Sequence, residues 1–182
     1  NDASDAESDT DNDGATALEE FVRDTDPAEP ELEEQRLTWN APSFLVTDQA
    51  ANIELIYDTS DNNAETDGLA FKLFYNTTAV GQAIDEGFIF GESRVDSGAS
   101  VEDSGDEDDN PATDRYQLFE WTPTGATWPG QGSLPLILLS FSVTPSADVS
   151  SLELNIVPVS EATGYELIYE SLSLKVGAVS LD

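Results

Sequence analysis

An all-β fold, a two-sheet sandwich or jelly roll of eight or nine strands, is predicted by three features of this 182-residue chain. From Leu37 onward, apolar residues recur at every second position, which is the period of a strand with one buried face. Turn residues such as Pro129-Gly130 and Thr163-Gly164 separate these runs. No long amphipathic helical stretch interrupts them. Hydrophobic residues make up 38% of the chain, which is enough to build a core.

The expected strands follow one another along the chain from Ile53 to Val176. Each is identified by apolar residues that share one face. The core-facing sets are Ile53, Leu55 and Tyr57; Leu69, Phe71, Leu73 and Tyr75; Ile137, Leu139, Phe141 and Val143; Leu152, Leu154 and Ile156; and Leu172, Leu174 and Val176.

The charge balance excludes several classes of function. Acidic residues number 38 and basic residues six, giving a net charge of -32, so nucleic acid and anionic lipid are poor partners. The chain has no His and no Cys, which removes Ser-His-Asp and Cys-His catalysis, zinc and iron–sulfur sites, and disulfides. The acids cluster in residues 1–35 and 85–114, which favours local cation sites, although adaptation to salt also raises acidity.

Residues 9–20 match the twelve-residue calcium loop at nearly every position. Asp9, Asp11 and Asp13 supply oxygens from alternate positions, and Gly14 permits the turn at the sixth. Ala15 offers its backbone carbonyl, and Glu20 closes the loop as the bidentate twelfth ligand. Calcium takes six to eight oxygens at about 2.3–2.6 Å, and this spacing folds them around one point. We therefore predict a Ca²⁺ site here.

The flanks of this loop indicate a stalk instead of a paired sensor. The residues before it are too few and too polar for an entering helix, and Leu18–Val22 forms about one exiting turn before Pro27 ends it. Residues 1–29 resemble thrombospondin type 3-like calcium repeats, and also one loop of a dockerin. The resemblance implies a calcium-rigidified segment. Residues 30–36 are an acidic, Pro-containing linker, and residues 37–182 form the sandwich.

Four segments in order resemble the cohesin family, over about residues 50–176. They are Asp67–Val80, Tyr116–Trp121, Gly132–Val143 and Leu172–Val176. The chain departs from the pattern at Thr77, where cohesins carry proline, and in its long acidic loop from Gly91 to Thr113. The resemblance implies a nine-stranded jelly roll that acts by binding and does not catalyse. It does not name the partner.

Two further acidic segments are candidates for second calcium sites. One lies in a connection between expected strands and contains Asp58, Asp61 and Asp67. The other runs from Glu102 to Asn110 and contains Asp106 and Asp108. Without a cation these carboxylates repel one another, so a bound ion orders the loop. The alternative for both segments is a solvated acidic loop.

Other residues carry weaker functional hypotheses, each beside a structural one. Asn76-Thr77-Thr78 is an N-glycosylation sequon. Trp121 and Trp128 are candidates for a sugar-stacking platform, although sandwich aromatics more often pack in the core. Glu120 is the one acid to consider for a glycosidase. Lys72 and Lys175 are candidates for isopeptide cross-links, with exposed strand lysines as the alternative.

These features together predict a non-enzymatic, extracellular, calcium-binding structural module that mediates protein–protein assembly. Its role is that of a surface scaffold, adhesin or filament subunit. Its partner is either another protein or identical subunits, through the sandwich or the N-terminal segment. The alternative is a carbohydrate-binding module of a secreted polysaccharide-degrading system. The longest apolar stretch, residues 134–143, is too short to insert through a membrane. The start at Asn1 without Met indicates a mature product or a piece of a longer chain.

Overall fold

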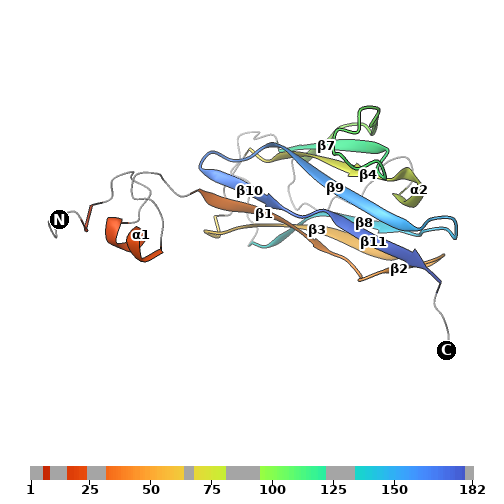
Figure 1. Ribbon diagram of the computed structural model, residues 1–182, viewed down its shortest axis with the longest axis horizontal. Helices are drawn as coiled ribbons and strands as arrows, with labels where there is room; N and C mark the ends of the chain where they lie inside the picture. Colours follow the sequence, from red (N-terminus) through yellow and green to blue (C-terminus); the bar gives the residue numbers. More distant parts are fainter. Residues whose placement is uncertain are drawn as a thin grey trace. The chain divides into compact units, whose positions relative to one another are not determined.

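The computed structural model describes residues 6–8, 16–23, 32–63, 68–80, 95–121 and 134–178. The chain divides into two compact units, residues 1–33 and 34–182. The second unit contains two β-sheets, which Figure 1 shows together with the helices and strands named below.

The first unit contains helix α1, Ala17–Arg23, which begins with a capping box. Glu19 Oε2 accepts a hydrogen bond from the backbone N–H of Thr16 at 2.9 Å, and Thr16 Oγ1 accepts one from the backbone N–H of Glu19 at 3.4 Å. The start of α1 is also joined to the residues before the expected calcium loop, because Ser8 O accepts a hydrogen bond from Ala17 N at 2.8 Å. The exiting turn is therefore present, as a helix of seven residues.

The second unit pairs a four-stranded sheet with a seven-stranded one. The first has the order β10 (Tyr165–Tyr169), β1 (Glu33–Asn40), β3 (Ala51–Thr59) and β8 (Leu136–Val143). The second has the order β2 (Leu45–Val46), β11 (Leu172–Gly177), β9 (Ser151–Ser160), β4 (Ala70–Tyr75), β7 (Arg115–Trp121) and β5 (Val95–Ser97). Strand β6 (Val101–Glu102) also pairs with β7, and the short helix α2 (Thr77–Val80) follows β4. Strand pairing is antiparallel except between β11 and β2.

The predicted all-β sandwich is confirmed. Among the described residues, eight strands have five residues or more and three are shorter. The core lies between the sheets and is built from the expected alternating residues, including Leu55 and Tyr57 on β3 and Leu73 on β4, none of which is accessible to solvent. A buried polar side chain, Gln35, joins β3 to the connection between β9 and β10. Gln35 on β1 donates to the Tyr57 hydroxyl at 2.8 Å and accepts from Ala162 N at 2.8 Å.

One predicted core position is wrong. Ile137 was expected to face the core with Leu139, but the register between β3 and β8 shifts between Leu55 and Ile56. This β-bulge adds a residue to β8, so that Leu138 and Leu139 both enter the core cluster and Ile137 does not. Strict alternation cannot anticipate such an inserted residue.

Candidate functional site

The acidic loop, residues 103–113, connects β6 to β7 and folds back over the seven-stranded sheet. Its two ends are joined by a hydrogen bond from Asp103 N to Asp114 O at 2.9 Å. Asp106 and Asp109 adopt positive φ angles of 52° and 54°, a conformation that Asp tolerates better than most residues. The loop is thus a folded structure with two tight turns.

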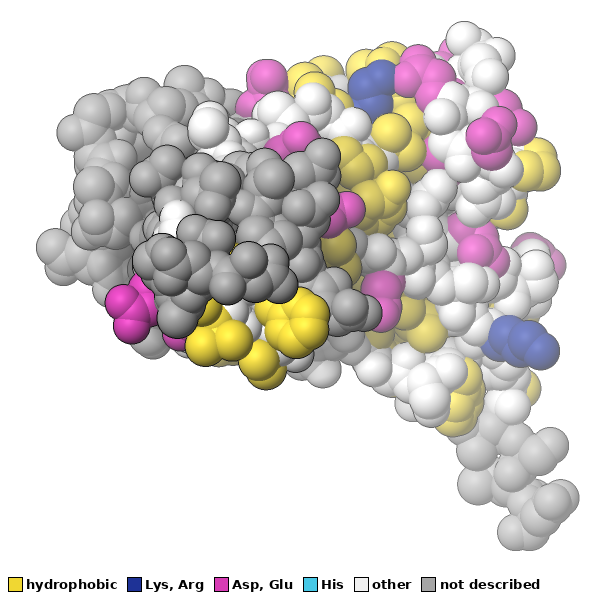
Figure 2. Space-filling view, turned by 60° about the vertical axis from the view of Figure 1, so that its left-hand side comes forward, with side chains coloured by type: hydrophobic (Ala, Val, Ile, Leu, Met, Phe, Trp, Pro, Cys, Tyr) yellow, Lys and Arg dark blue, Asp and Glu magenta, His cyan; other side chains and the backbone are white. Residues whose placement is uncertain are grey.

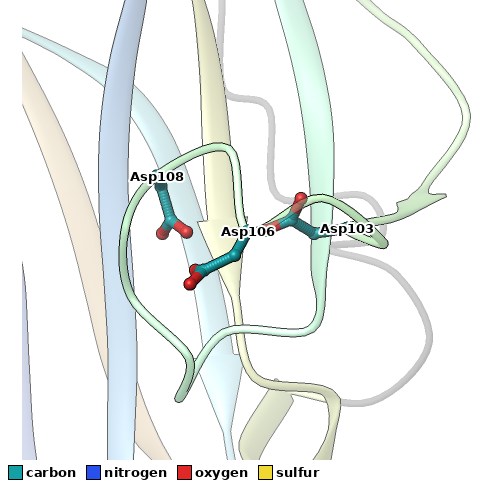
Figure 3. Close-up of side chains that lie close together, drawn as sticks. All are labelled: Asp103, Asp106 and Asp108. Atoms are coloured by element: carbon teal, nitrogen blue, oxygen red, sulfur yellow. The ribbon is translucent and has the colours of Figure 1, made fainter.

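Three carboxylates converge within this loop, as Figure 3 shows. Ligand oxygens of Asp103, Asp106 and Asp108 all lie within 4.8 Å of one another. Asp103 Oδ2 is buried and accepts no hydrogen bond, whereas both oxygens of Asp108 accept from the Thr113 hydroxyl, at 3.0 and 2.9 Å. Carboxylate oxygens are the ligands that hard divalent cations prefer, and each has two lone pairs. This cluster can hold a metal ion.

Two contacts join the acidic loop to the face of the seven-stranded sheet that points away from the core, which we call its outward face. Lys72 on β4 forms an ion pair with Glu107, and its ammonium lies 4.6 Å from the centre of the Tyr116 ring. The carboxylate of Glu107 raises the pKa of Lys72 above its usual value, because it favours the charged ammonium. Asn155 on β9 donates to both the backbone oxygen and the carboxylate of Asp108, at 3.2 Å each.

The loop contributes to a second small apolar cluster outside the main core. Phe74 on β4 is fully buried, although it alternates with the core-facing Leu73 and Tyr75 and is not part of the main core cluster. Its ring centre lies 5.1 Å from that of Tyr116. Phe74 is paired in register with Asn155 and Tyr116, and Asn155 in turn contacts the loop at Asp108. The outward face therefore carries a buried aromatic ring, Phe74, beside the loop.

The next row of the same face is more accessible. Lys72 pairs in register with Leu118 on β7 and with Val157 on β9, so these three side chains lie side by side. Leu118 and Val157 are partly exposed. Val159, which is 52% exposed, follows them on β9 at a shift in the register against β4, where it is the extra residue. We call Lys72, Leu118, Val157 and Val159 the outward patch. Figure 2 shows how sparse basic side chains are among the acidic and hydrophobic ones on the described surface in view.

Most of the predicted N-terminal calcium ligands lie outside the described residues. These are Asp9, Asp11, Asp13 and Ala15, together with the side chain of Glu20, whose backbone belongs to α1. The site they form stays a prediction.

The candidate calcium site at Asp58, Asp61 and Asp67 lies only partly within the described residues. The carboxylate of Asp61 accepts hydrogen bonds from the Tyr165 hydroxyl at 2.7 Å and from Asn63 N at 3.0 Å. Burial raises the pKa of Asp61, but these hydrogen bonds outweigh it and the pKa is lowered. Asp58 Oδ1 accepts from Thr59 N, and Asp67 lies outside the described residues. Among the described acids, Asp58 and Asp61 do not join a group of three.

The remaining candidates are placed as follows. Asn76 is 8% exposed, and its amide donates to Ser151 O at 2.8 Å while accepting from Glu153 N at 2.9 Å, so the folded chain presents little of it for glycosylation. Trp121 ends β7 and its side chain is not described, while Trp128 lies outside the described residues. Glu120 and Lys175 are exposed on strands of the seven-stranded sheet.

Asp103 is the ligand residue that the sequence did not single out. The density of acids between Glu102 and Asn110 gave Asp106 and Asp108 as candidates, although this segment lacks the regular spacing of the N-terminal loop. Asp103 joins them because the turns at Asp106 and Asp109 bring the two ends of the loop together. Its position directly after β6, at the start of the acidic loop, is the feature that could have identified it.

Comparison with known proteins shows the fold. No protein-family model and no curated protein matches the chain. Among solved structures, a cohesin module from Clostridium perfringens ATCC13124 family 33 glycoside hydrolase matches with a TM-score of 0.51 and 15% sequence identity. The match covers 80% of this chain and 98% of that module. The sandwich is cohesin-like. At this identity the likeness concerns the fold alone.

Proposed function

We propose that this chain is a non-enzymatic, extracellular, calcium-binding structural module that mediates protein–protein assembly. The observation that carries the proposal is the outward patch of the seven-stranded sheet. Its apolar residues lie around Lys72, whose charge is rare on so acidic a protein. Exposed apolar residues bordered by polar ones are typical of protein interaction surfaces.

The cohesin-like fold supports the same proposal. The matched structure is a cohesin module from a glycoside hydrolase, and this chain shares its fold. We therefore assign the sandwich a binding role.

Calcium has two places in this proposal. The first is the N-terminal loop, with Asp9, Asp11, Asp13, Ala15 and Glu20 as ligands. The hydrogen bond between Ser8 and Ala17 supports it, because it brings the ninth position of the loop back to the residue that precedes Asp9, and ligands of such a loop must converge. In this proposal residues 1–29 form a calcium segment, and the linker expected at 30–36 is shorter, because β1 of the sandwich already begins at Glu33.

The second place is the cluster of Asp103, Asp106 and Asp108. Three carboxylates this close repel one another strongly unless a cation lies between them. Calcium outside cells is millimolar, which is enough to occupy even a weak site of this kind. The extracellular assignment rests on this chemistry. No helix in the described part of the chain is long and apolar enough to cross a membrane.

The assembly role is tested by capture on the immobilised chain in millimolar calcium. Proteins from the growth medium of the source organism are applied to the unchanged chain, to Val159→Asp and to Phe44→Asp. Phe44 is the matched control, because it is 51% exposed but lies between β1 and β2, away from the outward patch. Retention of a defined protein that Val159→Asp abolishes and Phe44→Asp preserves supports the proposal. Equal retention by all three contradicts it.

The N-terminal calcium site is tested by calorimetric titration of Asp11→Ala. Removal of one ligand from a converging set lowers affinity sharply, so one binding event is expected to disappear while the thermal unfolding of the sandwich stays unchanged. Asp24→Ala, an acid beyond the loop, is the control. Unchanged calcium stoichiometry in Asp11→Ala contradicts the assignment.

A further inference from the structure

We draw no further inference here: the strongest candidate, the cluster of Asp103, Asp106 and Asp108 in the loop between β6 and β7, belongs to the site already described, and the buried oxygen without a donor there, Asp103 Oδ2, is part of a residue that is only partly buried and that already accepts a hydrogen bond from Glu107 N.

Discussion

Lys72 on β4 and Glu107 in the acidic loop form an ion pair that ties the candidate metal cluster to the proposed binding face. Glu107 lies between Asp106 and Asp108 in sequence, and its carboxylate reaches Lys72. A change in the position of Glu107 is therefore expected to alter the position of Lys72, the cation of the outward patch. The neighbouring contact between Asn155 and Asp108 holds the other side of the loop.

Replacement of Lys72 by Met is expected to loosen the acidic loop without unfolding the sandwich. Methionine is of similar length but has no charge, so it loses both the ion pair with Glu107 and the cation–π contact with Tyr116. The amides of Glu107, Asp109 and Thr113, which are bonded within the loop, are expected to exchange hydrogen faster. The loss of stability is expected to stay below about 1 kcal/mol, as for other exposed ion pairs.

Lys175→Met is the matched control for this exchange experiment, because Lys175 is exposed on β11 of the same sheet. Equal exchange in the loop of both variants would show that Glu107 does not hold the loop through Lys72.

Asp106→Asn is expected to change stability in opposite directions with and without calcium. Without calcium it removes one of three mutually repelling charges, so the sandwich unfolds at a higher temperature. With calcium it removes a ligand, and the stabilisation by the ion falls. A site filled at a hundredfold excess over its dissociation constant contributes about 2.7 kcal/mol. Asparagine tolerates the positive φ at this position, so the backbone is not strained.

Calorimetric scans with calcium and with chelator measure both effects. Asp109→Asn is the control, since Asp109 also has a positive φ but lies outside the cluster. If calcium raises the unfolding temperature of Asp106→Asn as much as that of the unchanged chain, the cluster is not a calcium site.

Sequence patterns predicted the sandwich better than they predicted its loops. Leu55, Leu73 and Leu154 are all buried where the alternation placed them, because a strand with one apolar face has only one favourable orientation. Ile137 was misplaced because a β-bulge depends on the partner strand. Asp103 was not selected because its approach to Asp106 depends on the turns of the loop between them and after them. The spacing of residues along the sequence does not predict such contacts.

Gln35→Leu is expected to destabilise the sandwich by about 2–4 kcal/mol. Gln35 is fully buried, and leucine would remove both its donor to the Tyr57 hydroxyl and its acceptor for Ala162 N. A buried polar group that loses its partner retains its desolvation cost, which is why the apolar replacement does not help. Urea unfolding is expected to show a lower midpoint with an unchanged slope. Thr38→Val, on the exposed side of the same strand, is the control, and a similar midpoint for both variants would contradict this role of Gln35.

Tyr165→Phe is expected to raise the pKa of Asp61. The Tyr165 hydroxyl donates to Asp61 Oδ2 at 2.7 Å, and it is the largest of the contributions that lower this pKa against the opposing effect of burial. A carboxyl whose pKa is lowered on folding stabilises the protein above its unfolded pKa and loses that contribution as the pH falls through the folded pKa. In Tyr165→Phe this contribution is therefore smaller, and its loss is complete at a higher pH, because the folded pKa lies closer to the unfolded one. Carbon-13 NMR titration of the Asp61 carboxyl measures the shift, with Tyr169→Phe at the other end of β10 as the control. An Asp61 that titrates at the same pH in Tyr165→Phe and in the unchanged chain would show that this hydrogen bond does not stabilise the ionised carboxylate.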